Sequence, residues 1–251
     1  MEMMTRSGNP ALKENVFKRV EQAPVAQEGV MTIQGTVGKV ALLLLTVVAS
    51  GALVWFRSMS EGFAGIATMF YGGAIGGFIV SLIIIFNQRL APVLALPYAV
   101  LEGLVLGGIS AFMEQIYPGI VSTATVLTFG TFAALLATYQ SGLIRATGSF
   151  RRMVVSATGA IAIYYLLSFV LSFFGMNLPL IHDSGMAGII FSLIVVGVAA
   201  MNLVLDFDFI EQGARQGAPK YMEWYGAFGL MVTLVWLYIE LLRLLAKTRR
   251  R

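Results

Sequence analysis

Residues 187–209 read AGIIFSLIVVGVAAMNLVLDFDF, an apolar run that ends in two aspartates. A helix of about 20 such residues crosses the roughly 30 Å hydrocarbon core of a bilayer. Because lipid cannot satisfy backbone polar groups, a run of this length must be helical, and the alternating ten-residue segments of a membrane β-barrel are absent. The sequence therefore predicts an all-α polytopic membrane protein with seven transmembrane helices, near residues 38–56, 63–86, 93–114, 121–144, 153–174, 187–209 and 222–245.

Composition excludes most other classes of protein. Of the 251 residues, 58% are hydrophobic and only 12% are charged, about half the usual share for a soluble domain. The chain has no cysteine and one histidine, which excludes a disulfide framework, a thiolate metal site and an H-E-x-x-H zinc protease. No phosphate-binding glycine loop is present, and the run at 222–245 lacks the lysine that retinal requires. We therefore expect neither an enzyme nor a resident cofactor.

Charge placement predicts the domain organisation and the orientation. Residues 1–36 form a polar tail, 37–246 the transmembrane domain, and 247–251 a basic C-terminal tail. With the N-terminus in the cytoplasm, most of the 17 Lys and Arg residues fall on the inner side, as the positive-inside rule favours. These residues lie at the ends of the runs and in the tails. We therefore expect a lipid bilayer as the surroundings and no nucleic-acid partner.

Of the acidic residues in the apolar runs, four are candidates for a position in the hydrocarbon region: Glu102, Asp206, Asp208 and Glu240. A carboxylate in the hydrocarbon region is costly, and it commonly marks a path for ions or protons. Glu102 lies about nine residues into its run, which at 1.5 Å per residue places it near the bilayer midplane. These four residues are the candidate ion pathway and pH sensor.

Asp206 is expected to face inward. It lies four residues after Asn202, so both side chains share one face of the helix. Asp208 is two residues further on, points to a different side, and is expected to face interfacial water. The alternative for Asp206 is an interfacial ion pair with Arg215 or Lys220.

Structural alternatives exist for the other two acids. Glu240 has Arg243 at i+3 and Lys247 at i+7, a spacing that allows an ion pair on one helix face. Glu102 has no basic residue three or four positions away. Its alternative role is a protonated acid that hydrogen-bonds to a neighbouring helix.

Two further features of the sequence are pairs of glycines within the apolar runs and a histidine–aspartate pair in a predicted loop. Gly72 and Gly76, Gly73 and Gly77, and Gly103 and Gly107 have the small-xxx-small spacing that lets helix backbones approach closely. His182 and Asp183 lie in a predicted outer loop, where we expect a solvated pair.

Three stretches resemble the bacterial branch of the Bax inhibitor-1 family, the transmembrane Bax inhibitor motif proteins. They are LPYAVLEGLVLGGIS at 96–110, GLIRATGSFRR at 142–152 and NLVLDFDFIEQGARQGAPKYMEWYGAFGL at 202–230. The last stretch is the most specific. The resemblance implies a bundle in which six helices surround the last one. It also implies a pH-sensitive calcium leak gated by two aspartates, one in each of the last two helices.

Carried over to this chain, the resemblance assigns the sixth-helix aspartate to Asp206, a weak and transient calcium ligand. The partner in the seventh helix falls on Thr233 if Leu241 to Arg243 keep the family register, or on Glu240 if acidic character decides. Geometry disfavours an Asp206–Glu240 pair, because the two lie at different depths. Our own hypothesis is that Glu102 takes the partner role.

The expected function is therefore a pH-sensitive calcium leak channel in a prokaryotic inner membrane, with calcium or protons as the permeating or regulating ions. Two alternatives stay open. One is a proton-coupled transporter of a small solute with Glu102 as proton carrier. The other is a non-conducting regulator of membrane proteases or of the stress response, which would bind other membrane proteins.

Overall fold

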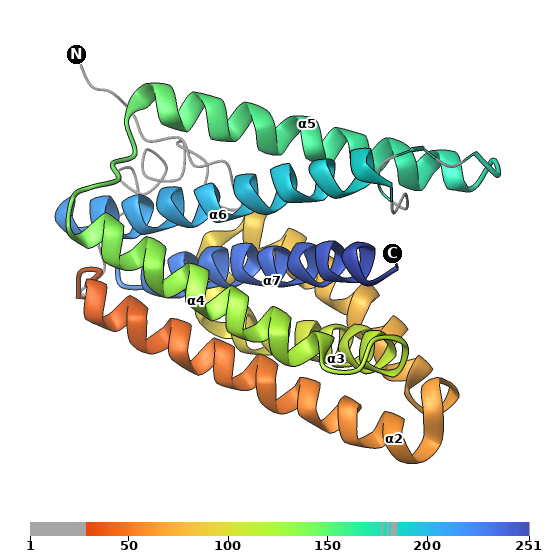
Figure 1. The fold of residues 1–251 in the computed structure, drawn as a ribbon. Coiled ribbons are helices and arrows are strands. Elements are labelled where there is room, and N and C mark those ends of the chain that lie inside the picture. Colours follow the sequence, from red (N-terminus) through yellow and green to blue (C-terminus); the bar gives the residue numbers. More distant parts are fainter. Residues whose placement is uncertain (1–28, 177, 180, 182–184, 251) are drawn as a thin grey trace. The chain divides into compact units, whose positions relative to one another are not determined.

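The computed structural model describes residues 29–176, 178–179, 181 and 185–250. The expected tail up to residue 28 and the pair His182 and Asp183 lie outside this part. The described residues form helices and no strand, and six of the helices are long and apolar enough to cross a membrane. In chain order (Figure 1) the elements are α2 (Ile33–Phe86), η1 (Gln88–Leu90), α3 (Ala91–Ile116), α4 (Ile120–Gln140), α5 (Gly148–Ser172), α6 (Met186–Arg215) and α7 (Met222–Arg249).

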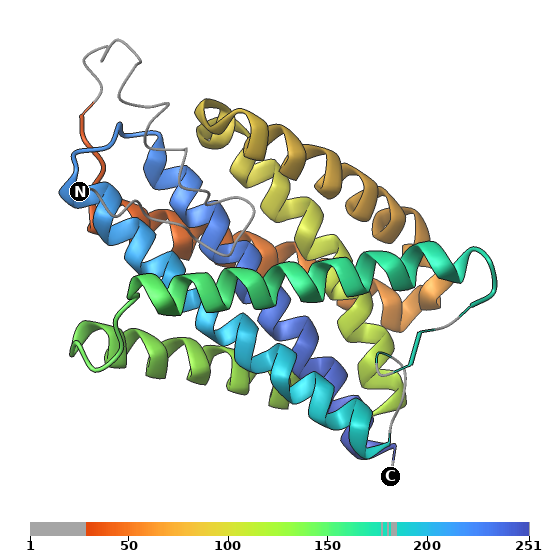
Figure 2. The same ribbon diagram turned by 90° about the horizontal axis from the view of Figure 1, so that it is seen from above.

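Helix α2 is broken in its middle. Its 54 residues would span about 80 Å as one straight helix, more than twice the hydrocarbon core. Gly62 has φ 66° and ψ −170°, a conformation outside the helix that residues with a Cβ rarely adopt. Figures 1 and 2 show the chain reversing direction in this region. The two apolar runs expected at 38–56 and 63–86 lie on either side of the break.

Contacts divide the chain into two compact units, and α6 and α7 contribute to both. The first unit contains Gly119–Asp208 and the C-terminal part from Thr233. The second unit contains the described residues up to Pro118 together with Phe209–Val232. Each unit is described by itself below.

In the second unit, glycines let α3 pack closely on α2. A Cβ on Gly103 would lie 2.4 Å from the Val47 carbonyl oxygen, and one on Gly107 would lie 2.4 Å from that of Gly51. On the other half of α2, a Cβ on Gly73 would lie 2.7 Å from the Leu101 carbonyl oxygen. Real Cβ atoms do not approach backbone oxygens this closely, so these glycines set the helix separation.

The substitution Gly107→Ala is expected to lower the stability of the protein by about 1–3 kcal/mol, because the added methyl group would force α2 and α3 apart. Gly72→Ala is the matched control, since a Cβ there would meet nothing within 4 Å. Thermal unfolding of the purified protein in detergent measures both effects. Equal unfolding temperatures for the two variants would contradict this account of the packing.

In the first unit, α5, α6 and the C-terminal part of α7 share an apolar core. Ile161 of α5 packs with Val195 and Val198 of α6, and the ring of Trp236 from α7 lies against them. From α4, the rings of Phe132 and Tyr139 contact Phe207 with centroids 5.6 and 5.8 Å away. This core positions the polar residues of α6 and α7 described next.

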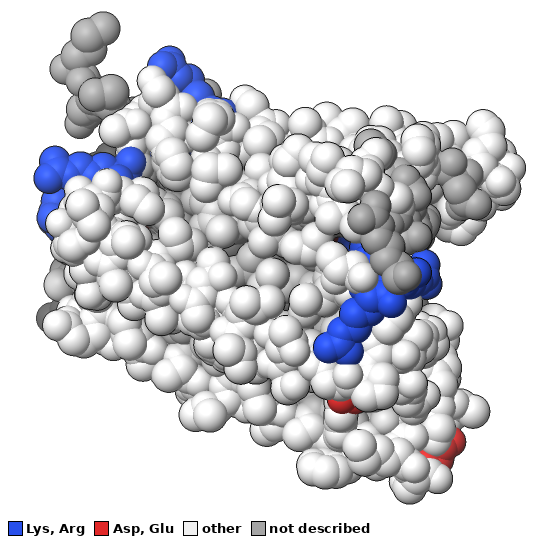
Figure 3. All heavy atoms as spheres, viewed as in Figure 1, with Lys and Arg blue, Asp and Glu red and all other residues white. Residues whose placement is uncertain are grey.

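The outer surface is apolar, as expected for a protein in lipid. Large side chains such as Phe86, Phe169 and Leu193 are 77%, 63% and 60% exposed. The face shown in Figure 3 is predominantly uncharged, with Lys and Arg gathered in a few places. Helix α7 is the most buried of the six candidate spans in the described part of the chain: 61% of its most apolar window is buried.

Candidate functional site

Buried polar side chains follow one another along α6 and α7 within the first unit. We call them the polar seam, which consists of Ser192, Asn202 and Asp206 on α6 and Thr233 and Glu240 on α7. Each is at most 2% exposed. The seam extends about 21 Å along α6, since Ser192 and Asp206 are 14 residues apart at 1.5 Å per residue.

The two helices run antiparallel, and two contacts fix their register. The Lys247 ammonium donates a hydrogen bond to the Gly188 carbonyl oxygen at 3.0 Å, and Trp236 packs on Val198. The same register places Thr233 level with Asn202. Asn202 of α6 and Thr233 of α7 therefore lie at the same depth.

Asn202 binds α5 through its amide. Its Nδ2 donates to Thr158 Oγ1 at 2.8 Å and to the Val198 carbonyl oxygen at 2.9 Å. Among the described residues, nothing hydrogen-bonds its buried Oδ1. Asp206 follows one turn later and is 0% exposed, so the structure places it in the interior.

The cations expected as alternative partners of Asp206 bind other acids. Arg215 pairs with Glu211, and Lys220 pairs with Glu223 at 2.7 Å. Both pairs belong to the second unit. The ion pair of Asp206 with Arg215 or Lys220 stays a prediction.

Asp208 does not face open interfacial water. Its carboxylate forms an ion pair with Arg151 of α5, and the two side chains are only 15% and 11% exposed. The sequence pattern indicated that Asp208 points away from Asp206 but did not reveal this partner, which lies 57 positions earlier in the chain. Asp208 and Arg151 thus join the start of α5 to α6.

Glu240 lies in a cluster with Tyr165 of α5 and Arg243 of α7. Its Oε1 accepts hydrogen bonds from the Tyr165 hydroxyl at 3.0 Å and from Arg243 Nη1 at 2.7 Å. Arg243 also donates to the Tyr165 hydroxyl oxygen at 2.7 Å. The expected i+3 ion pair is present, whereas Lys247 reaches Gly188 on α6 instead.

Glu102 belongs to the second unit, whereas Asp206 belongs to the first. It is half-buried, and the Tyr98 hydroxyl is its hydrogen-bond partner. Tyr98 lies one turn earlier on the same helix, α3. The Tyr98 ring in turn packs edge-on against Phe228 of α7 at 4.9 Å between centroids.

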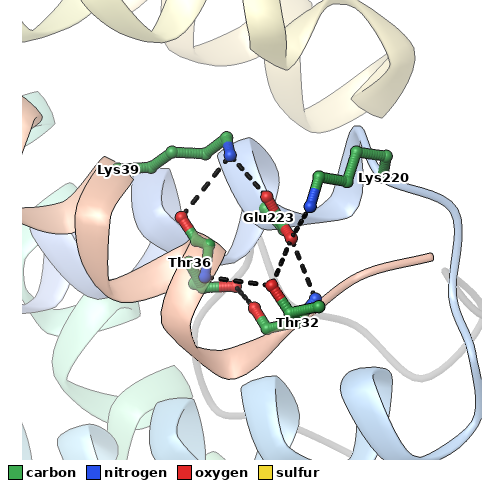
Figure 4. Close-up of polar contacts among 6 residues, drawn as sticks. Thr32, Thr36, Lys39, Lys220 and Glu223 are labelled. Carbon is green, nitrogen blue, oxygen red and sulfur yellow. Dashed lines mark hydrogen bonds and ion pairs between the residues drawn. The ribbon is translucent and has the colours of Figure 1, made fainter. Parts of the chain in front are cut away.

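Glu223, in the first turn of α7, is a buried acid that the sequence interpretation missed. It is 0% exposed, and its Oε1 accepts hydrogen bonds from Lys220 at 2.7 Å and from both the amide and the hydroxyl of Thr32 at 2.9 Å (Figure 4). Its Oε2 pairs with Lys39 of α2. We call Glu223, Lys39, Lys220 and Thr32 the Glu223 cluster.

The Glu223 cluster joins the beginning of α2 to the beginning of α7. The Thr32 hydroxyl also caps α2 by accepting from the Gly35 amide at 3.0 Å, and the Met31 amide donates to the Ala218 carbonyl oxygen at 2.7 Å. A sequence signal existed, because Lys220 lies at i−3 from Glu223. The partner Lys39 is 184 positions away, which no local pattern reveals.

Comparison with known proteins identifies a family over nearly the whole chain. The model of a family described as Bax inhibitor 1 like matches residues 9–250. The chain belongs to the Bax inhibitor 1-like family. No curated protein and no solved structure matches the chain.

The stretches that resembled the Bax inhibitor 1-like family contain several of the polar residues described above. Residues 96–110 lie in α3 around Glu102, and residues 142–152 lead into α5 with Arg151. Residues 202–230 contain Asp206 and Glu223. Within the described residues, no three or more His, Cys, Asp or Glu side chains form a group that could hold a metal ion.

Proposed function

We propose that this Bax inhibitor 1-like protein is a pH-sensitive calcium leak channel whose path follows the polar seam. The observation that carries the proposal is the seam itself. Carboxylates at Asp206 and Glu240 and polar groups at Asn202 and Thr233 lie buried in helices that are otherwise apolar. Buried polar groups in such helices are costly and commonly line a route for ions.

The proposed topology has seven crossings. The part of α2 before Gly62 and the part after it would each cross once, because each is longer than the roughly 20 residues that a crossing needs. The N-terminus would lie in the cytoplasm and the protein in a prokaryotic inner membrane. The seam would then run from Asp206 in the inner half to Glu240 in the outer half.

In the proposed mechanism, ionised Asp206 attracts calcium, which prefers oxygen ligands. Protonation of the carboxyl removes that attraction and changes the contacts between α6 and its neighbours. The population of the conducting state then depends on pH, because the protonated and ionised forms favour different helix arrangements. A path with no group of three or more acidic side chains among the described residues suits weak and transient binding, which fits a leak better than a calcium store.

The test uses purified protein in liposomes that contain a calcium-sensitive dye. Calcium entry above that of protein-free liposomes, with a rate that changes between pH 5 and 8, is the expected result. No entry at any pH would contradict the proposal. The same assay tests Glu102, since Glu102→Gln should alter the pH profile if this residue is coupled to Asp206, and an unchanged profile would remove it from the mechanism.

One observation favours a second function, that of a non-conducting regulator. The Glu223 cluster ties Thr32, near the end of the expected polar tail, to the start of α7, so a partner that pulls on the tail would act on this helix. A regulator would lose its membrane-protein partners on deletion of residues 1–28 and would show no calcium flux. A channel would keep its flux after the same deletion.

A further inference from the structure

One buried carboxylate oxygen in the C-terminal half of α7 lacks a hydrogen bond. Glu240 is 1% exposed, and its Oε1 accepts hydrogen bonds from the Tyr165 hydroxyl and from Arg243. Among the described residues, nothing donates to its Oε2, which is also buried. A buried carboxylate oxygen without a donor is costly, and an unsatisfied group of this kind calls for a ligand that the side chains do not supply.

A second unsatisfied oxygen lies on the facing helix. Ser192 is 1% exposed, and its Oγ has no hydrogen-bond partner in the described part of the chain. Ser192 lies one turn after Gly188, and Arg243 lies one turn before Lys247. Because Lys247 bonds to Gly188, the antiparallel register places Ser192 level with Arg243. The unsatisfied oxygen of Ser192 on α6 therefore lies at the depth of Arg243 and within about one turn of the depth of Glu240 on α7.

Arg243 is the more exposed partner of its ion pair with Glu240. Its side chain is 31% exposed, whereas that of Glu240 is 1% exposed. The guanidinium also stacks on the Tyr165 ring at 5.1 Å from its centroid. It thus supplies the positive charge that the buried carboxylate needs, but it is tethered and lies nearer to the surface than the group it neutralises.

We propose that Glu240 is a binding site for a divalent cation at the C-terminal end of the polar seam, and that Arg243 competes with the cation for it. When the guanidinium moves away, Glu240, the Tyr165 hydroxyl and Ser192 Oγ offer oxygen ligands, and the cation keeps its remaining waters. The role of this site in ion flux rests on the proposed channel function. The competition for the carboxylate does not depend on it.

Binding is tested without flux, by the thermal stability of purified protein in detergent with CaCl₂ or with NaCl at equal ionic strength. Arg243→Gln should bind Ca²⁺ at least about fivefold more tightly than the wild type, the lower end of typical coupling between two ligands of one site. The double variant Glu240→Gln with Arg243→Gln should lose this gain. Equal calcium responses of the single and double variants would overturn the proposal.

If Arg243→Gln folds poorly, the more conservative variant Arg243→Lys tests the same competition. Arg243→Lys retains a positive charge for Glu240 but lacks the planar fork and the stacking on Tyr165. Its calcium affinity should lie between those of the wild type and Arg243→Gln. If it bound Ca²⁺ no more tightly than the wild type, competition by the guanidinium would be excluded.

Flux in liposomes distinguishes this proposal from the channel function. Arg243→Gln should admit calcium at least about fivefold faster than the wild type, whereas Arg249→Gln, which removes an exposed charge from the same helix, should not. Equal rates for Arg243→Gln and a conducting wild type would overturn the role of this site in ion flux but leave the channel function intact. Calcium binding at Glu240 without flux in any variant would overturn the channel function alone.

Discussion

Replacing Glu223 by Gln is expected to lower the free energy of unfolding by about 2–4 kcal/mol. The carboxylate is fully buried and accepts charged hydrogen bonds from Lys39 and Lys220, and each such bond contributes about 1.5–3 kcal/mol. The full sum is not expected, because the Lys39 and Lys220 side chains are 18% and 45% exposed and partly recover hydration. Thr32, which caps α2, loses an anionic acceptor as well.

Glu211→Gln is the matched control for the Glu223 cluster. Glu211 also pairs with one basic side chain, Arg215, but the two side chains are 30% and 76% exposed. Such surface pairs contribute at most about 1 kcal/mol. Unfolding of both variants in detergent by heat or by denaturant measures the difference. A loss for Glu223→Gln no larger than that for Glu211→Gln would show that the cluster does not stabilise the junction of α2 and α7.

Local patterns in the sequence were sufficient to predict the helices. Apolar runs of about 20 residues indicated where they lie, because in lipid a backbone must satisfy its own hydrogen bonds. The break in α2 was predicted from the polar residues between two runs. The chain turns sharply at this break because Gly62 has a positive φ. A hydropathy pattern does not predict backbone dihedral angles. Helices α2 and α5 begin before the expected runs, since their capping residues Thr32 and Thr147 lie outside the apolar stretch, whereas α4 ends at Gln140, before the expected end of its run.

The buried acids were predicted one by one, but most of their partners were not. The i+3 pair of Glu240 and Arg243 followed from helical spacing. The pairs of Asp208 with Arg151 and of Glu223 with Lys39 join residues distant in the chain, so helix spacing carries no information about them. Glu223 was missed for a related reason: it lies at the first turn of a run, where an acid usually meets water or the helix dipole.

Asp206→Asn is expected to reduce calcium entry into liposomes at least tenfold. The amide has nearly the same shape as the carboxyl, so packing in the first unit should be retained, but the negative charge is lost. At an effective dielectric constant of about 20, one charge at 4 Å from a monovalent cation contributes about 4 kcal/mol, and 1.4 kcal/mol already corresponds to a factor of ten. Losing even one third of this attraction therefore corresponds to a tenfold reduction of calcium entry.

Asp208→Asn is the control for this prediction. It removes the same charge two residues further along α6, from a side chain that Arg151 already neutralises. Its effect should appear in stability, through the loss of the link between α5 and α6, rather than in the pH dependence of flux. Equal losses of flux in both variants would indicate a general effect of helix α6 and not a role for Asp206.

The central claim is that the buried carboxyl of Asp206 lies on the route of the ion. Its most direct test is the initial rate of calcium entry into liposomes that contain equal amounts of folded wild-type, Asp206→Asn or Asp208→Asn protein, measured from pH 5 to 8. We expect pH-dependent entry for the wild type and Asp208→Asn, and entry at the level of protein-free liposomes for Asp206→Asn. Wild-type rates and an unchanged pH profile in folded Asp206→Asn would contradict the account.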